Sequence, residues 1–441
     1  MLQPRPRLES VARRLYGWLT RLAVPLLRRK LARRAVAEPG YAEAVPERFG
    51  FYRQPPEAVS EMVWVHAVSL GETRTAAILL RAWREQKPAL RVLLTHGTAT
   101  GRAEGLSLLR PGDVQVWQPW DSPPAVKRFL THFKPRLGVL LETEVWPDLM
   151  AAAAGQKLPV VLVNARLSPK SLAAAQRMAW LSRPAYAALA AVYAQTAADA
   201  ERLALIGAPG PAVLGNLKFD ARPDAAQQAL ARQWREQWPA PVLMLASSRE
   251  GEELEFIRQW LALKALATPA AALARQVRVL IVPRHPQRFD EVQGLLEQLG
   301  LKVSRRSAWA AGPAQSSEAL QADVWLGDSL GEMALYYSMS SLALLGGSFE
   351  PLGGQNLIEP AACACPVVMG PHTFNFAEAA ASAQAAGAAL RVADMAAAWQ
   401  QALALLGSPA QLQRAAAAAR GFAASHGGAA ARTAKALNDW L

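Results

Sequence analysis

Short apolar runs alternate with helical stretches from about residue 60 onward, and this alternation limits the possible folds more than any other feature of the chain. The runs have the length of buried strands, and one of the helical stretches between them covers 72–86. The first series of runs lies at 62–65, 92–95, 114–117, 137–141, 160–163, 190–194 and 212–215. Strands that alternate with helices predict a parallel sheet that is covered on both faces.

A second series of apolar runs begins after Trp238-Pro239-Ala240-Pro241, the stretch that best fits a linker. These runs lie at 242–246, 277–282, 324–327, 342–345 and 366–369. We therefore predict two doubly wound, Rossmann-like α/β domains that face a cleft, with a ligand between the C-terminal ends of their strands. The chain lacks a Gly-x-x-x-x-Gly-Lys-Ser/Thr loop, and no Gly-x-Gly-x-x-Gly turn follows its first strand. An ATPase or a dehydrogenase is therefore not indicated.

Basic residues are concentrated at the start of the chain. Residues 1–34 hold ten basic side chains and one acid, Glu9, which is a net charge of +9 out of +13 and leaves +4 for the other 407 residues. A basic head on a nearly neutral body does not indicate nucleic-acid binding, and we expect no nucleic-acid partner.

The basic head also places Leu, Trp and Tyr between its arginines. Its apolar stretch at 15–27 is too short to span a bilayer and is interrupted by Arg21 and Pro25. Basic residues interleaved with apolar ones are typical of a helix that lies on an anionic membrane surface. The alternative is a solvated basic helix that packs on its own protein.

Cys363 and Cys365 are the two cysteines of the chain. We interpret them as small core residues, because a metal site would need more ligands at suitable spacing and the six histidines do not cluster around them. Two cysteines provide no disulfide framework, which fits a reducing cytoplasm.

The segment 353–360, Gly-Gly-Gln-Asn-Leu-Ile-Glu-Pro, follows an apolar run and a Gly346-Gly347-Ser348 turn. Paired glycines let the backbone approach a ligand closely. Asn356 and Glu359 lie three positions apart where a helix is predicted to begin, so both are expected to project from its first turn. Free N–H groups there suit a phosphate, and a glutamate suits the hydroxyl pair of a ribose. The segment therefore predicts a nucleotide site.

Acidic residues follow two of the predicted strands in the first half. Glu72 occurs where the helix after the first strand begins, and a carboxylate there can accept a proton from an acceptor hydroxyl. The alternative is a capping box in which Ser69 is the N-cap and Glu72 occupies N3. Glu142 and Glu144 alternate at the end of a strand, so only one of them needs to face the cleft.

Cations follow predicted strands in both halves. Arg166 and Lys218 lie in the first half and could meet an anionic substrate, and Arg284 and His285 in the second half are potential phosphate donors. The alternatives are a surface position for Lys218 and an N-cap-like loop position for His285. The segment 327–333 lies at the end of the next predicted strand, and its glycine lets the backbone approach a flat base. The alternative for its glutamate is that it only begins a helix.

In their order, these segments closely resemble those of the 3-deoxy-D-manno-octulosonic acid (Kdo) transferases, inverting glycosyltransferases of the GT-B fold from Gram-negative lipopolysaccharide synthesis. The resemblance covers nearly the whole chain, including the basic head. It is carried by the segments 47–50, 66–73, 142–147, 164–168, 215–220, 283–286, 328–333 and 346–360. Ser248-Arg249 and Gln355 depart from the pattern of the family, and we assign them no role.

The resemblance implies CMP-Kdo as the donor, the lipid A precursor lipid IVA as the acceptor, and no cofactor. It makes Glu72 the base that activates the glucosamine hydroxyl, while Glu142 and Lys218 stabilise the transition state. The residues that it implies for CMP binding are Arg284, His285, Leu330, Gly331, Glu332, Asn356, Leu357, Ile358 and Glu359. Because cations can hold the phosphate and the carboxylate of the sugar while a base takes the proton, no sequence feature requires a metal.

Three domains are predicted: a membrane-association segment at 1–34, an acceptor-binding domain at 35–238 and a CMP-sugar-binding domain at 239–441. The expected location is the cytoplasmic face of the inner membrane. One alternative is a GT-B transferase that uses a UDP-sugar, which a comparison of melting temperatures with CMP and UDP would distinguish. Another is a membrane or nucleic-acid adaptor, which would explain the basic head but not the acids and cations at so many strand ends.

Overall fold

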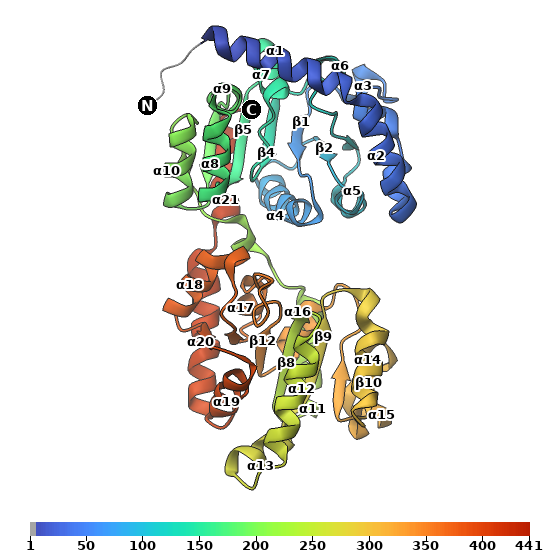
Figure 1. Ribbon diagram of the computed structural model, residues 1–441, viewed down its shortest axis with the longest axis vertical. Helices are drawn as coiled ribbons and strands as arrows, with labels where there is room; N and C mark the ends of the chain where they lie inside the picture. The colour runs from blue at the N-terminus through green and yellow to red at the C-terminus, as the bar shows by residue number, and fades with distance from the viewer. Residues whose placement is uncertain (1–5) are drawn as a thin grey trace. The chain divides into compact units, whose positions relative to one another are not determined.

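The computed structural model describes residues 6–441, and the part of the basic head before Pro6 lies outside the described residues (Figure 1). The chain forms two compact units. The first comprises the chain up to Asp220 together with His426–Leu441, and the second comprises Ala221–Ser425. The boundary expected between 238 and 239 therefore differs from the structural one, and the end of the chain belongs to the first unit.

The first unit is built around a sheet of seven strands. Its strands are β1 (Val63–His66), β2 (Val92–His96), β3 (Val114–Trp117), β4 (Leu137–Leu141), β5 (Val160–Ala165), β6 (Ala191–Ala194) and β7 (Ala212–Val213). Their order is β3-β2-β1-β4-β5-β6-β7, and all the pairings are parallel. The chain leaves β1 toward one edge and β4 toward the other, so the C-terminal ends of β1 and β4 form the switch point where doubly wound sheets bind ligands.

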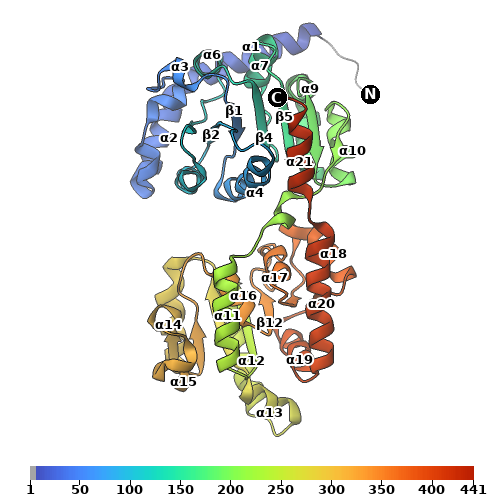
Figure 2. The same ribbon diagram turned by 180° about the vertical axis from the view of Figure 1, so that it is seen from behind.

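Helices cover both faces of this sheet, as Figures 1 and 2 show. They are α1 (Pro6–Leu22), α2 (Val24–Ala37), α3 (Pro56–Val59), α4 (Leu70–Gln86), α5 (Ala99–Gly105), α6 (Pro123–Phe133), α7 (Pro147–Gly155), α8 (Pro169–Arg177), α9 (Ala179–Ala187), α10 (Ala197–Ile206) and α21 (Ala429–Asn438). Short 3₁₀ turns include η2 (Val45–Phe49) and η4 (Leu217–Asp220).

Successive side chains of the first sheet pack into different cores. Trp64 of β1 packs in one core with Phe129 of α6, whereas Val65 packs in the other core with Trp83 of α4 and Leu437 of α21. Both faces are therefore buried, which is why these strands read as continuous apolar runs. The position of Leu437 explains why the last helix belongs to the first unit.

The basic head forms two helices, α1 and α2, and α1 packs against α7 and α9. Gly17 allows this close approach, because a Cβ at that position would lie 3.2 Å from Oδ2 of Asp148 in α7 and 2.9 Å from Cγ of Pro123 in α6. The hydroxyl of Tyr16 hydrogen-bonds Asp121. Among residues 6–441, the length and apolar content needed to cross a membrane are not combined in any helix.

The second unit contains another sheet of seven strands. Its strands are β8 (Val242–Ser248), β9 (Arg278–Pro283), β10 (Val303–Arg305), β11 (Val324–Leu326), β12 (Leu342–Leu345), β13 (Val367–Met369) and β14 (Ala389–Arg391). Their order is β10-β11-β9-β8-β12-β13-β14, again with parallel pairings throughout. The predicted α/β class with two parallel sheets is thus confirmed, although the short edge strands β10 and β14 were not predicted. The ends of β8 and β12 form the switch point of this sheet.

Helices also cover both faces of the second sheet. They are α11 (Ala225–Gln237), α12 (Glu252–Lys264), α13 (Pro269–Gln276), α14 (Phe289–Gln298), α15 (Ser317–Gln321), α16 (Met333–Met339), α17 (Ile358–Ala362), α18 (Ala377–Ala385), α19 (Met395–Leu406) and α20 (Pro409–His426). Trp234 of α11 is buried in a core with Met244 and Trp325, which explains why α11 belongs to the second unit. The proline-rich stretch after it is therefore the connection from α11 to β8, not a linker between domains.

Candidate active site

Glu72 lies in the first turn of α4, directly after β1 at the switch point of the first sheet. Its backbone N–H donates to Oγ of Ser69 at 3.3 Å, and its carboxylate accepts from Oγ of Ser69 at 3.0 Å and from the backbone N–H of Val68 at 2.9 Å. Burial raises the pKa of Glu72, the Val68 hydrogen bond lowers it, and the charge of Glu142 raises it again, with a net increase. A capping role is thus present, and a raised pKa also suits a general base.

Glu142 follows β4 at the same switch point, and its side chain links two cations. Its carboxylate accepts hydrogen bonds from Nζ of Lys218 at 2.9 Å and from Nε of Arg166 at 2.8 Å. The residue is only 4% exposed and has a left-handed backbone with φ of 59°. This conformation costs on the order of 1–3 kcal/mol for a residue other than glycine, and such strain is concentrated at functional sites.

Two asparagines place Lys218 next to Glu142. Oδ1 of Asn164, at the end of β5, accepts the backbone N–H of Leu217 at 3.0 Å, and Oδ1 of Asn216 accepts the backbone N–H of Lys218 at 3.0 Å. The segments 164–168 and 215–220 therefore meet at the end of the sheet. The three residues predicted to be catalytic, which lie far apart in the sequence, are brought together in the first unit.

Glu144 adds a third carboxylate to this cluster. It accepts a hydrogen bond from Nε1 of Trp146 at 2.9 Å. Burial, followed by the charge of Glu72, raises the pKa of Glu144 to about 7. Glu142 is thus the acid that pairs with the cations, whereas Glu144 is influenced by the negative charge of Glu72. The cluster combines a proton acceptor with fixed cations that can stabilise developing negative charge.

In the second unit, a buried carboxylate holds the glycine turn after β12. A Cβ on Gly346 would lie 2.5 Å from a backbone oxygen at the end of β8, so this close approach requires glycine. The carboxylate of Glu252 accepts the backbone N–H groups of Gly347 at 2.8 Å, Arg249 at 2.9 Å and Phe349 at 3.2 Å. We did not predict a role for Glu252 from the sequence. The one sequence feature that could have indicated it is its position in the first turn of a helix.

Positive charge gathers at the ends of β8 and β9. Arg284 and His285 follow β9 and are exposed, and the backbone N–H of Arg284 donates to the carbonyl of Ser248 at 3.0 Å. Partial burial, followed by the charges of Arg249 and Arg284, lowers the pKa of His285. Three basic side chains that influence one another in this way can bind a phosphate group.

The loop of Leu330, Gly331 and Glu332 follows β11 and is held by neighbouring segments. The carbonyl of Gly331, where φ is 81°, accepts a hydrogen bond from Nε2 of Gln227 at 2.9 Å. The carboxylate of Glu332 pairs with Arg306 at 2.9 Å. Leu330 is 75% exposed. The backbone of the loop is therefore fixed, while the carboxylate of Glu332 already has a cation as its partner.

The glycine segment before α17 has the predicted turn but a different helix start. The glycines at 353–354 have φ values of 89° and 74°, which favour glycine. Asn356 lies before α17, and its Oδ1 accepts the backbone N–H of Ile358 at 3.0 Å, so Asn356 and Glu359 do not share a first helical turn as expected. Leu357 and Ile358 are each 1% exposed, so any contact that they make with a ligand would come from their backbone.

Two doubly wound units with parallel sheets, each with charged residues at its switch point, define an α/β chain of the GT-B type. The solved structure of UDP-GlcNAc 2-epimerase from Neisseria meningitidis bound to UDP-GlcNAc has the same fold, with a TM-score of 0.55 and 16% identity over 86% of this chain and 99% of that one. Likeness at this level of identity concerns the fold alone.

Comparison with known sequences then gives the family. Residues 43–221 match the family described as 3-deoxy-D-manno-octulosonic-acid transferase (kdotransferase). The 3-deoxy-D-manno-octulosonic acid transferase of Bordetella pertussis is 46% identical over 98% of this chain and 100% of the relative, and that of Haemophilus influenzae is 31% identical over 82% of this chain and 83% of the relative. The chain belongs to the Kdo transferases, a family of glycosyltransferases.

Proposed function

We propose that this protein transfers Kdo from CMP-Kdo to the lipid A precursor lipid IVA, with inversion at the anomeric carbon and release of CMP, in lipopolysaccharide core synthesis. The observation that carries the proposal is the cluster of Glu72, Glu142 and Lys218 at the switch point of the first sheet, in a chain of this family. It provides a proton acceptor beside a fixed cation, which are the two groups that a single displacement needs.

In the proposed reaction, the hydroxyl oxygen of the acceptor bonds to the anomeric carbon of Kdo while the bond from that carbon to the phosphate of CMP breaks. The carboxylate of Glu72 takes the hydroxyl proton, and CMP leaves with the bonding electron pair. Lys218, held in place by Glu142 at 2.9 Å, stabilises negative charge in the transition state. No covalent intermediate with the protein forms, so the configuration inverts.

The second unit would bind the donor in this proposal. Arg284 and His285 supply positive charge for the phosphate. The fixed backbone of the 330–332 loop and the glycine turn at 353–354 allow close approach of the nucleotide. Glu359 would accept hydrogen bonds from the ribose hydroxyls. Glu332 would contact the nucleotide as part of its ion pair with Arg306.

A transfer assay with purified protein, CMP-Kdo generated in situ and lipid IVA tests this function. We expect mass spectrometry to show acceptor that has gained one or more Kdo units, and CMP rather than UDP to raise the melting temperature. The number of added units gives the functionality of the enzyme. Absence of product together with absence of CMP binding would contradict the proposal, and stabilisation by UDP alone would favour a UDP-sugar transferase.

We also propose that the basic head holds the protein on the anionic cytoplasmic face of the inner membrane. Seven apolar side chains of the head are 54–70% exposed: Leu8, Val11, Leu15, Trp18, Leu19, Leu22 and Leu26. All but Leu26, which lies in α2, follow one another along α1 at helical spacing and form one stripe. Exposed apolar and basic side chains on the same helices are suited to the interface of a membrane.

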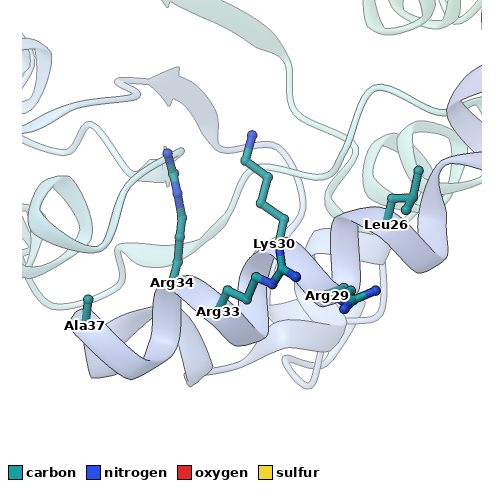
Figure 3. A pocket seen from close by; sticks show the side chains of 6 residues that line it. All are labelled: Leu26, Arg29, Lys30, Arg33, Arg34 and Ala37. Carbon is teal, nitrogen blue, oxygen red and sulfur yellow. The ribbon is translucent and has the colours of Figure 1, made fainter.

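The basic face of α2 supports the same proposal. Arg29, Lys30, Arg33 and Arg34 line a hollow of about 440 Å³, and Lys30 and Arg34 point to the same side of the helix (Figure 3). Arg34 also contacts Tyr41 through its guanidinium, which ties this face to the body of the unit. A row of exposed cations on one helix can bind the phosphates of anionic lipids.

Replacing Arg29, Lys30 and Arg33 together by alanine is expected to weaken binding to anionic vesicles on the order of 100-fold, because each basic residue near such a surface contributes about 1 kcal/mol. Cosedimentation with phosphatidylglycerol-containing vesicles measures this. The control replaces Lys134, Arg136 and Lys157, which line another basic hollow in the first unit. Equal losses in the two triple variants, or unchanged binding in the first, would contradict a specific role of α2.

A further inference from the structure

The segment Glu47-Arg48-Phe49-Gly50 has a structural anchor that the catalytic proposal does not use. Glu47 accepts the backbone N–H of Trp117 at 2.8 Å and pairs with Arg102 at 3.3 Å. Arg48 is only 4% exposed, and its guanidinium lies 3.8 Å from the ring centre of Trp117. The side chain of Arg48 is therefore held rigidly inside the first unit.

From Arg48, a chain of three hydrogen bonds leads to the carboxylate of Glu72. Nη2 of Arg48 donates to the carbonyl of Gly97 at 2.9 Å. The backbone N–H of Gly97 donates to the carbonyl of Val68 at 3.0 Å. The backbone N–H of Val68 then donates to Oε2 of Glu72 at 2.9 Å. Each link joins segments that lie far apart in the sequence, except for the last.

Gly97 and Val68, in the middle of this series of hydrogen bonds, have little freedom to move. The carbonyl of Val68 also accepts the backbone N–H of Thr98 at 2.9 Å and its hydroxyl at 3.0 Å. A Cβ on Gly97 would lie 2.6 Å from Cγ1 of Val68, so the two turns are in close contact. A shift of the Gly97 carbonyl would therefore move Val68 and its N–H relative to Glu72.

We propose that Arg48 is a positioning residue for Glu72, which acts by fixing the Gly97 carbonyl and, through Gly97 and Val68, the hydrogen bond to the carboxylate. This inference rests on the proposed role of Glu72 as the base. Arg48 touches neither reactant in this proposal, and its effect passes through the backbone. The segment 47–50 thus has a function in the orientation of the reacting carboxylate.

The charges that face Glu72 come from two other segments of the first unit. Glu142 follows β4 and raises the pKa of Glu72, Lys218 of η4 lowers it, and Glu144 lies close enough to interact with Glu72. Burial lowers the pKa of Arg48 to about 10, so Arg48 is a cation at neutral pH. The hydrogen bond from Val68 lowers the pKa of Glu72. If this bond is lost, the pKa of Glu72 rises further.

The test compares Arg48→Ala and Gly97→Ala with Arg128→Met. We expect the first two variants to lower kcat by about 10- to 100-fold, since small misplacements of a reacting group have effects of this size, while KM for CMP-Kdo changes less than about 2-fold. Because Glu72 must be ionised to act as a base, the acid limb of their pH–kcat profiles should move to higher pH. Millimolar guanidinium ion should restore kcat in Arg48→Ala but not in Gly97→Ala.

Arg128 is a matched control, because it donates to the carbonyl of Phe49 in the same segment. This bond is not part of the series of hydrogen bonds that ends at Glu72. The Arg128 variant should lose stability without a shift of the acid limb. The inference is overturned by an unshifted limb in the first two variants, or by an equal shift in Arg128→Met. If Arg48→Ala does not fold, Gly97→Ala decides. Undiminished transfer in a Glu72→Gln variant would instead overturn the proposed base itself.

Discussion

Replacing Glu72 by glutamine is expected to leave a folded protein whose transfer rate is about 10²- to 10⁴-fold lower, the usual contribution of a general base. Glutamine has nearly the same shape, and its amide oxygen can still accept the N–H of Val68, which the carboxylate binds at 2.9 Å. It cannot accept a proton from the acceptor hydroxyl. The rate of Kdo transfer to lipid IVA under saturating CMP-Kdo, together with the melting temperature, measures both consequences.

Ser69→Ala separates catalysis from helix capping. The Ser69 hydroxyl caps α4 by accepting the N–H of Glu72, so its removal should cost about 1 kcal/mol of stability. It also removes the hydrogen bond from Oγ of Ser69 to the carboxylate of Glu72 at 3.0 Å, but it leaves the carboxylate and its bond from Val68 in place. We therefore expect Ser69→Ala to melt earlier but to retain most of its transfer rate. If Glu72→Gln retained full activity, Glu72 would be a capping residue only.

Replacing Glu252 by alanine is expected to destabilise the second unit by at least about 3 kcal/mol, because three backbone N–H groups lose a charged acceptor. Glu252 is 2% exposed. Burial raises its pKa, although the N–H groups of Gly347, Arg249 and Phe349 oppose the increase. The charge is thus costly to bury, but its removal leaves these donors without their partner.

Thermal unfolding measures the effect of Glu252→Ala, and we expect a decrease of about 6–12 °C for a unit of this size. CMP binding should weaken as well, because the glycine turn after β12 loses its support. Glu252→Gln keeps one accepting oxygen and should lie between the wild type and the alanine variant. Glu250→Ala, at an exposed position two residues earlier, is the control and should change the melting temperature little. Similar melting of both alanine variants would show that Glu252 does not hold the turn.

Much of the fold could be predicted because central parallel strands are buried on both faces. The run at 137–141 coincides with β4 and the run at 342–345 with β12, since every residue in them is apolar or glycine. The edge strands β10 and β14 have three residues each, which is too short for a periodic signal. The domain boundary could not be predicted, because a proline-rich connection inside a unit has the same composition as a linker.

Sequence position after a strand marked Glu72, Glu142, Glu144 and Lys218 as candidates, because parallel strands all end at one edge of their sheet. The resemblance to the Kdo transferases then singled out Glu72, Glu142 and Lys218, whose catalytic roles stay predictions. Sequence position could not show which residues pair. The bond from Gly347 to Glu252 joins residues 95 positions apart, and the bond from Leu217 to Asn164 joins residues 53 apart. Such pairs depend on packing and leave no local pattern. The same holds for Asn356, whose side chain is used by the turn itself.

The return of α21 to the first unit also determines when that unit can finish folding. Nε1 of Trp83 donates to Oδ1 of Asn438 at 2.9 Å, a contact between residues 355 positions apart. Domains generally fold in the order in which they leave the ribosome. Here the whole second unit leaves the ribosome before α21, the helix that covers Trp83. Until α21 has been synthesised, part of the core of the first unit stays exposed. During synthesis, the second unit should therefore reach its native state before the first unit, which carries Glu72.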